Sequence, residues 1–298
     1  MGSTHDYKED PRNNDIQIYI NGTLFHRLEA KISVMDSGYL LGDGVWEGIR
    51  LHKGKLLHLN SHLSRLYSGA KLLDFKINLS PNQIKEALTK TIEINKMYTD
   101  VHIRLIISRG IKKTPYQHPK VTIGDPTIVI IPEFKKVNMD DINKGITLGL
   151  VKTIRDYRVQ DPQINSLSKH NCISACIEAI KLGVDEGIML DPKNNVSTCN
   201  STNLFIVRDG AVLTSKGAYC LKGITRGAII RICNEYKIKI YEKDFSISDV
   251  YNADEVFVTG TFAGVIPVVR VDSFVMSNHR IGKTTKRLQE YYSLDMEK

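Results

Sequence analysis

The chain of 298 residues has no long apolar run. No stretch approaches the roughly 20 consecutive apolar residues that a membrane-spanning helix requires, which argues against a membrane protein. Residues 1–15 are polar and include four acidic side chains, so they resemble neither a secretory signal nor a mitochondrial transit peptide. The sequence therefore predicts a soluble, cytoplasmic protein.

Cysteine is also scarce, with five residues, and the odd number does not suggest a disulfide framework. Cys172 and Cys176 are one helical turn apart, but no second cysteine pair or histidine completes a metal site around them. We therefore expect free, mostly buried thiols and no bound metal.

The chain also lacks a dense cluster of charged residues of one sign. The chain carries 41 Lys and Arg against 33 Asp and Glu, a net charge of +8. The densest basic runs are the pairs at 112–113 and 135–136, and neither is flanked by a set of stacking aromatics. A dispersed excess of this size argues against nucleic acid as a partner, and a small anionic ligand is the more interesting possibility.

Composition is that of an ordinary globular protein, with 42% hydrophobic and 25% charged residues. Strand and helix patterns are interspersed, which indicates an α+β fold in two unequal domains. The polar, aperiodic stretch 133–144 is the expected linker between residues 1–132 and residues 145–298. Asn21-Gly22 predicts a hairpin turn, Ser61 and Thr225 are expected N-caps, and a helix is expected from Pro81 to about Met97.

Two short segments have the chemistry of a phosphate site. Gly223-Ile224-Thr225-Arg226 directly precedes a predicted helix, whose free N–H groups and positive dipole end attract an anion. Thr259-Gly260-Thr261 ends a predicted strand with two hydroxyls and a flexible glycine. Together these two loops could grip one phosphate, although each taken alone is equally a capped helix or a strand-end turn.

From about Ile16 onward the chain resembles the class IV aminotransferases, which use pyridoxal 5'-phosphate and have the branched-chain and D-amino-acid aminotransferase fold. The motifs that carry the resemblance occur in the family's order: 42–50 GDGVWEGIR, 62–66 HLSRL, 203–205 NLF, 223–226 GITR and 254–268 DEVF…IPV. The resemblance implies a fold-type IV architecture with a smaller N-terminal and a larger C-terminal domain, and the cofactor between them. It also implies a homodimer.

The resemblance assigns roles to residues of this chain. Arg65, Ile224, Thr225 and Thr261 fall on the phosphate-binding positions, and each keeps a suitable group. On the substrate side it points to Tyr39, Trp46 and Arg109, although a core position for Trp46 is an open alternative. The implied reaction is transamination between an amino acid, branched-chain or related, and a 2-oxo acid.

The catalytic centre departs from the family pattern. The family's lysine, which attaches the cofactor and shuttles the α-proton, stands in a K-S-L-N-Y pattern. Counting back without gaps from Glu178 places Asn165 at the lysine position and Lys169 at the tyrosine position. Thr198 stands where the family has a glutamate beside the pyridine nitrogen, which favours an unprotonated nitrogen and a weaker electron sink.

Three explanations of Lys169 remain open from the sequence. Lys169 supplies the covalent amine from the tyrosine position, or a shifted register returns it to the usual one. The third is that the protein has lost the reaction and binds a phosphorylated ligand. A lyase of the same fold, similar to the aminodeoxychorismate lyases, is the other enzymatic alternative.

Overall fold

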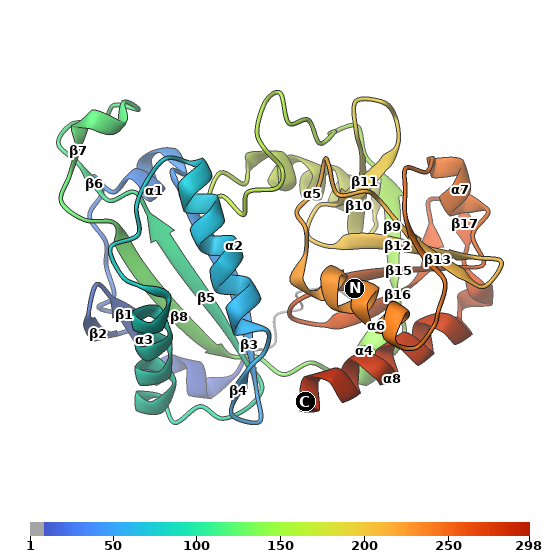
Figure 1. Cartoon of the computed structure of the whole chain (residues 1–298), viewed down its shortest axis with the longest axis horizontal. Helices are drawn as coiled ribbons and strands as arrows, with labels where there is room; N and C mark the ends of the chain where they lie inside the picture. Colours follow the sequence, from blue (N-terminus) through green and yellow to red (C-terminus); the bar gives the residue numbers. More distant parts are fainter. Residues whose placement is uncertain (1–8) are drawn as a thin grey trace. The chain divides into compact units, whose positions relative to one another are not determined.

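The computed structural model describes residues 9–298, which pack as two units (Figure 1). We call residues 9–136 with Ile164–Lys169 the N-terminal unit, and Val137–Gln163 with His170–Lys298 the C-terminal unit. The segment Ile164–Lys169 thus packs with the N-terminal unit, although it lies within the range expected for the second domain. The expected linker 133–144 includes the end of strand β8 (Thr127–Phe134) and the short helix α4 (Met139–Asn143).

The N-terminal unit is built on a six-stranded antiparallel sheet. Its strands, in spatial order, are β2 (Thr23–His26), β1 (Gln17–Ile20), β8, β5 (Val101–Ser108), β3 (Gly44–His52) and β4 (Lys55–Leu56). Asn21 and Gly22 both have positive φ and connect β1 to β2, which confirms the predicted hairpin. The small strands β6 (Ile111–Lys112) and β7 (Thr122–Ile123) pair separately.

Two helices pack on this sheet, α2 (Leu59–Leu72) and α3 (Pro81–Ile94). Val45, Ile49 and Leu51 occupy alternate positions of β3, and they share a buried core with Leu63 and Leu66 of α2. Alternation with period two is what places one side of a strand in a core. The six-stranded sheet therefore buries the β3 face that carries these residues under α2.

Two helix ends of this unit differ in detail from the sequence prediction, the start of α2 and the end of α3. Helix α2 begins at Leu59 with His58 as its N-cap, so Ser61 lies inside the first turn and was wrongly predicted as the cap. Ser80 caps α3 in a reciprocal capping box with Gln83, and α3 ends before Met97. Propensity alone places a cap only approximately, because the preceding chain must also enter the helix at a suitable angle.

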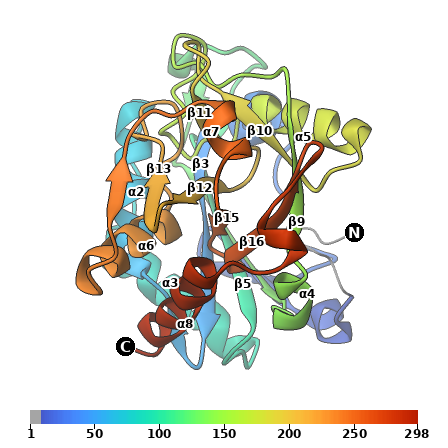
Figure 2. The same ribbon diagram turned by 90° about the vertical axis from the view of Figure 1, so that its right-hand side faces the viewer.

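The C-terminal unit contains a nine-stranded mixed sheet (Figures 1 and 2). Its strands, in spatial order, are β11 (Val196–Cys199), β10 (Glu186–Leu190), β9 (Ile146–Leu150), β16 (Gly264–Val271), β15 (Glu255–Gly260), β12 (Asn203–Arg208), β13 (Ala211–Thr214) and β14 (Ile240–Glu242), and β17 (Phe274–Val275) pairs with β16. Helix α5 (His170–Leu182) packs on β9 and β10, whereas α6 (Ile224–Glu235) and α8 (Lys283–Glu297) pack on each other and on β15. Helix α7 (Ile247–Tyr251) is one short turn.

Strand β12 shows why the central strands of this sheet are continuously apolar. Leu204 and Ile206 face one buried cluster, which also receives side chains from β9, β10 and β16. Phe205 and Val207 face a second cluster that contains the apolar sides of α6 and α8. Because both faces of the strand are buried, no polar alternation is left in its sequence.

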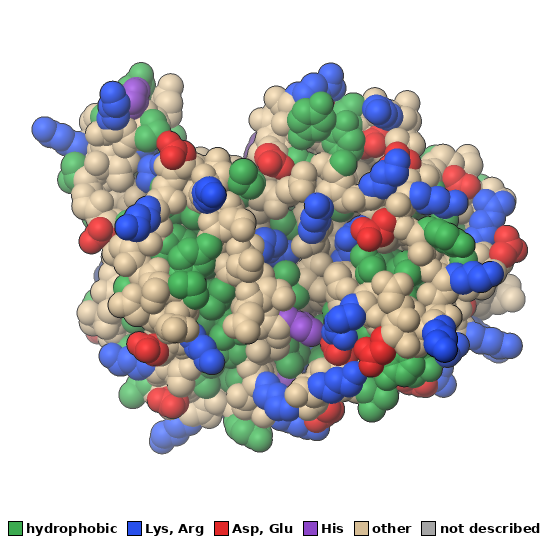
Figure 3. Space-filling view, viewed as in Figure 1, with side chains coloured by type: hydrophobic (Ala, Val, Ile, Leu, Met, Phe, Trp, Pro, Cys, Tyr) green, Lys and Arg blue, Asp and Glu red, His purple; other side chains and the backbone are tan. Residues whose placement is uncertain are grey.

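Basic side chains are dispersed on the face drawn in Figure 3. On the face drawn in Figure 3, Lys and Arg side chains lie among acidic and uncharged ones on each unit. Among residues 9–298 no helix is long and apolar enough to cross a membrane. In the same range no group of three or more His, Cys, Asp or Glu side chains has the arrangement of a metal site.

Candidate functional site

The residues singled out from the sequence fall into both units. Tyr39, Trp46, Arg65, Arg109, Asn165 and Lys169 belong to the N-terminal unit, and Thr198, Ile224, Thr225 and Thr261 belong to the C-terminal unit. Each unit gathers several of them into a local cluster of its own.

Trp46, Asn165 and Lys169 meet beside strand β3. The Asn165 side chain is buried, and its Nδ2 donates to the Trp46 carbonyl at 2.7 Å. The Trp46 amide in turn donates to the Asn165 carbonyl at 3.0 Å. Lys169 Nζ donates to Asn165 Oδ1 at 3.1 Å and lies 5.1 Å from the centroid of the Trp46 ring. The amine that the ungapped count predicts at the family's tyrosine position thus contacts the side chain that the same count predicts at the lysine position.

Arg104 of β5 completes this cluster. Its guanidinium carbon lies 4.0 Å from the centroid of the Trp46 ring, at cation–π distance. Burial lowers the pKa of Arg104, partly offset by the Glu133 carboxylate, but an arginine stays charged at any ordinary pH. Arg104 belongs to no sequence motif, because it is a single arginine inside a largely apolar strand.

Arg65 of α2 is held by a buried carboxylate. Glu47 of β3 is fully buried, and its two oxygens accept from Arg65 Nε at 2.8 Å and from Arg65 Nη2 at 2.7 Å. His62, one helical turn before Arg65, has its Nδ1 at 2.6 Å from Glu47 Oε2. An ionised carboxylate only accepts hydrogen bonds, so it is matched to all three donors. This pairing fixes one edge of the Arg65 guanidinium.

Two opposing effects act on the Glu47 carboxyl. Burial raises its pKa, but the hydrogen bonds from His62 and Arg65, together with the positive charge of Arg65, outweigh burial and hold the pKa below its ordinary value of 4.5. His62 Nε2 is buried and has no hydrogen-bond partner within residues 9–298. Glu47 and His62 belong to the motifs that carry the family resemblance, but the sequence alone did not indicate that they pair.

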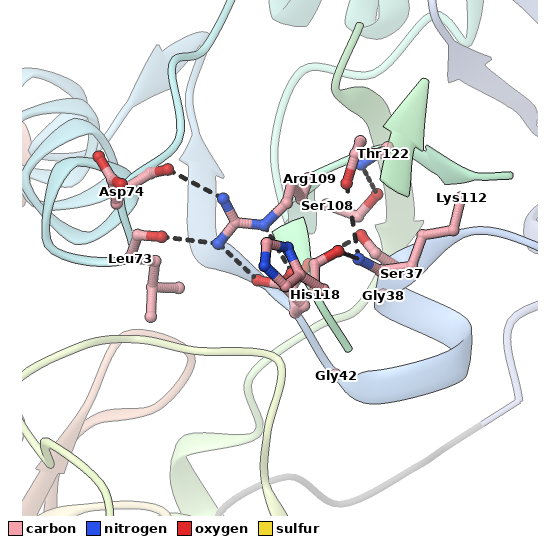
Figure 4. A network of polar contacts seen from close by, with 12 residues as sticks. Ser37, Gly38, Gly42, Leu73, Asp74, Ser108, Arg109, Lys112, His118 and Thr122 are labelled. Carbon is pink, nitrogen blue, oxygen red and sulfur yellow. Dashed lines mark hydrogen bonds and ion pairs between the residues drawn. The ribbon is translucent and has the colours of Figure 1, made fainter. Parts of the chain in front are cut away.

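Arg109 closes the end of helix α2 (Figure 4). Its Nη groups donate to the carbonyls of Leu73 at 2.6 Å and Asp74 at 2.9 Å, and its Nε donates to Asp43 at 2.6 Å. Basic side chains at a helix C-terminus satisfy carbonyls that have no partner within the helix. These contacts favour a structural role for Arg109, and the substrate-side role that the resemblance implies stays a prediction. Tyr39 of helix α1 (Ser37–Leu41) is largely exposed.

In the C-terminal unit, helix α6 begins at Ile224 with Gly223 as N-cap, so the cap lies slightly before the predicted cap Thr225. No side chain caps this end among the described residues, and Thr225 is buried. A Cβ on Gly223 would lie 2.1 Å from Asn203 Oδ1, so the glycine is required by close approach. Asn203 Nδ2 also donates to the Leu221 carbonyl at 3.0 Å, which fixes the loop that enters the helix.

Thr261 follows strand β15 and lies near the same point of the sheet. In the β12–β15 pair, Asn203 stands opposite Thr259, and Thr261 begins the turn into β16. The Thr259 hydroxyl is buried and has no hydrogen-bond partner within residues 9–298. The two loops that the sequence selected for a phosphate are therefore joined through Asn203.

Thr198 is buried at the end of β11, where its hydroxyl donates to the Thr202 carbonyl at 2.7 Å. Glu186 of β10 anchors the following loop, because its oxygens accept from Ser201 Oγ at 2.5 Å and from Thr202 Oγ1 at 2.7 Å. The single hydroxyl proton of Thr198 is engaged within the protein, so the hydroxyl presents lone pairs toward any other group.

Comparison with known proteins assigns the family. The model of the amino-transferase class IV family matches residues 44–271. The branched-chain-amino-acid aminotransferase-like protein 2 of Arabidopsis thaliana is 37% identical over 283 residues, which are 95% of this chain and 50% of that protein. A D-alanine aminotransferase of Staphylococcus aureus is 30% identical over 275 residues, 92% of this chain and 95% of the relative. The chain thus spans about half the length of the Arabidopsis relative and most of the bacterial one.

Solved structures agree with these relatives. The branched-chain amino acid aminotransferase from Escherichia coli aligns with a TM-score of 0.84 and 28% identity, covering 95% of each chain. A second solved branched-chain amino acid aminotransferase, in complex with N-(5'-phosphopyridoxyl)-L-glutamate, aligns with a TM-score of 0.88 and 28% identity, again covering 95% of each chain. This agreement confirms the predicted fold-type IV architecture. The chain belongs to the class IV aminotransferase family.

Proposed function

We propose that the protein binds pyridoxal 5'-phosphate and acts as an aminotransferase between an amino acid, branched-chain or related, and a 2-oxo acid. The family supports the proposal, and so does the phosphopyridoxyl ligand of the second solved aminotransferase. One observation carries it for this chain. Lys169 Nζ contacts Asn165 Oδ1 at 3.1 Å, so an amine lies beside the position that the sequence predicts for the family's lysine.

The residues of the C-terminal unit fit a phosphate group. The start of α6 has no side-chain cap, which leaves its first N–H groups to an anion, and the buried Thr259 hydroxyl has no protein partner in the described chain. We propose that Ile224, Thr225 and Thr261 hold the phosphate. Arg65 is proposed as the fourth contact, with its guanidinium oriented by Glu47.

The cofactor supplies the electron sink that stabilises negative charge at the substrate Cα. Lys169 Nζ is proposed to attach the cofactor and to carry the proton removed from that carbon. The Thr198 hydroxyl, whose proton is engaged by Thr202, can accept a hydrogen bond only from a protonated ring nitrogen, and it offers no proton to the unprotonated nitrogen that the sequence predicts. Threonine carries no negative charge, so it holds a proton on that nitrogen less firmly than the family's glutamate would.

We propose that Trp46 lines the substrate side of the site, as the family resemblance indicates. The substrate-side roles of Tyr39 and Arg109 stay predictions, and the contacts of Arg109 favour a structural role instead. A homodimer is likewise proposed from the family. Sedimentation of the purified protein measures its oligomeric state directly.

Reductive trapping tests the proposal. The purified protein is incubated with pyridoxal 5'-phosphate, reduced with borohydride and digested, and the modified lysine is mapped by mass spectrometry. The expected label is on Lys169, and it disappears in Lys169→Arg but not in Lys181→Arg, a control near the far end of helix α5. Transamination is then measured with amino-acid donors and 2-oxo acid acceptors.

Other outcomes identify the alternatives. Retained cofactor without any labelled lysine contradicts the proposal and supports a ligand-binding protein that has lost the reaction. Label on Lys169 with product formation that needs no acceptor supports a lyase, because a lyase does not transfer the amino group to a second substrate.

A further inference from the structure

The contacts of Asn165 suggest that it has a task of its own. Its amide orientation is determined, because Nδ2 faces the Trp46 carbonyl at 2.7 Å and a carbonyl can only accept. Oδ1 must then point the other way, where Lys169 Nζ lies at 3.1 Å. The acceptor that faces the amine is therefore set by a backbone group and not by the lysine itself.

The backbone around Asn165 is equally constrained. Ser166 forms a β-bridge with Val45, and the Leu167 amide donates to the Gly44 carbonyl at 2.9 Å. A Cβ on Gly44 would lie 2.7 Å from Leu167 Cδ1, so the two segments pack without spare room. Asn165 and the two residues that follow it are thus attached to strand β3, so the position of the Asn165 side chain is constrained within the N-terminal unit.

The Trp46 ring provides a second contact for the same amine. Lys169 Nζ lies 5.1 Å from the ring centroid, within the range of a cation–π interaction. A lysine side chain has several rotatable bonds and loses substantial entropy when it is held in one place. A hydrogen bond from one neighbour and a ring contact from another are two attractions that offset this loss.

We propose that Asn165 is a positioning residue for the amine of Lys169, with the Trp46 ring as its partner in that role. The inference rests on the proposed function for its purpose, which is to present one lysine amine to the cofactor. The two contacts themselves do not depend on the cofactor: in the free protein, Lys169 Nζ is held at Asn165 Oδ1 and over the Trp46 ring.

The test uses the cofactor-free full chain. Lysine amines are reductively methylated with ¹³C-formaldehyde, and the dimethyl-lysine resonances are recorded by NMR, with Lys169→Arg assigning the signal. Methyl groups held over an indole ring are shifted upfield by its ring current, so the Lys169 signal is expected upfield of that of exposed Lys181. Trp46→Leu is expected to remove this shift, because it removes the ring.

Variants at Asn165 decide the proposal. Asn165→Leu removes the acceptor and is expected to return the Lys169 signal to the position of Lys181, whereas Asn165→Asp keeps an acceptor and is expected to keep the shift. His170→Ala, at an exposed neighbouring position, is the matched control and leaves the signal in place. Circular dichroism confirms folding, and Asn165→Ala replaces Asn165→Leu if the larger side chain prevents it. A shifted signal that persists in the folded Leu or Ala variant overturns the proposal, as does an unshifted signal in the wild type.

Borohydride trapping separates this inference from the proposed function. If both hold, Asn165→Leu carries about fivefold to tenfold less label at Lys169 at subsaturating cofactor, the effect of one lost hydrogen bond. A ring-shifted Lys169 signal in a wild type that takes no label means that the proposed function fails while the positioning stands. Equal labelling of wild type and Asn165→Leu, with an unshifted signal in both, means that the positioning role fails while the proposed function stands.

Discussion

Replacing Glu47 with alanine removes the carboxylate on which the buried His62–Arg65 cluster depends. Glu47 is fully buried, and the Arg65 side chain is 15% exposed, so water replaces the lost partner only poorly. Three hydrogen bonds of 2.6, 2.8 and 2.7 Å disappear together. The variant leaves the guanidinium and a buried imidazole without their shared carboxylate, against the core of the N-terminal unit.

The expected cost is about 3–5 kcal/mol of unfolding free energy, the range for a buried ion pair that loses one partner. For a domain of this size each kcal/mol lowers Tm by about 2–4 °C, so a decrease of roughly 6–20 °C is expected. Glu93→Ala is the matched control, since Glu93 is an exposed position of α3 and its loss is expected to cost less than about 0.5 kcal/mol.

Chemical denaturation followed by circular dichroism measures both variants, and differential scanning calorimetry measures the Tm. The Glu47→Ala protein is also expected to bind pyridoxal 5'-phosphate more weakly, because Arg65 loses the group that orients it. If Glu47→Ala unfolds within about 0.5 kcal/mol of the wild type, the carboxylate does not stabilise the unit and the reasoning is refuted.

The same cluster predicts how the difference depends on pH. The pKa of Glu47 in the folded protein lies below its ordinary value of 4.5, so the unfolded chain takes up the proton first as the pH falls. The stabilisation by the ionised carboxylate is therefore complete above that value and is lost as the pH falls toward the folded pKa. The free-energy difference between wild type and Glu47→Ala is expected to shrink in this acidic range, and a difference that grows instead would contradict the assignment.

Three further variants and one control variant test the site. Gly223→Ala places a Cβ 2.1 Å from Asn203 Oδ1 and is expected to weaken cofactor binding at least tenfold, as measured by titration. Gly227→Ala, in open space on the same helix, is the control and is expected to raise the unfolding free energy by about 0.5–1 kcal/mol. The exchange Asn165→Lys with Lys169→Tyr restores the family's order, and borohydride labelling is expected to move to position 165 with a gain in transamination. Arg109→Leu is expected to lower the unfolding free energy by about 1–3 kcal/mol without changing KM for the amino acid; a raised KM with unchanged stability would return Arg109 to the substrate site.

Much of the local structure follows from short-range sequence patterns. The Asn21-Gly22 turn and the start of the helix at Pro81 are where the sequence predicts them. Helix ends are less accurate: the helix predicted to start at Ser61 begins at Leu59, and the one predicted at Thr225 begins at Ile224. Cap choice depends on how the preceding chain approaches, which a propensity does not contain.

The candidate site also combines features that are visible in the sequence with contacts that only the folded chain creates. Its proposed phosphate loop is visible in the sequence, because a glycine and a threonine before a helix are adjacent in the chain and would act through the helix's own N–H groups. The orientation of Arg65 by Glu47, and the need for Gly223 beside Asn203, could not be predicted. Each of these two contacts joins residues on different elements of secondary structure. Neither contact exists until a strand has packed against a helix or a loop.

The sequence by itself therefore determined the family, and it predicted the phosphate-binding motif and the departure at Asn165 and Lys169, because these are matters of residue identity and spacing. The tertiary structure decided what those residues touch. In the folded chain, Lys169 Nζ donates a hydrogen bond to Asn165, and the Arg109 guanidinium binds carbonyls at the C-terminal end of α2. The physical reason is that a side chain's partners are chosen by packing between segments far apart in the chain, and hydrogen-bond geometry is too short-ranged to be read from spacing.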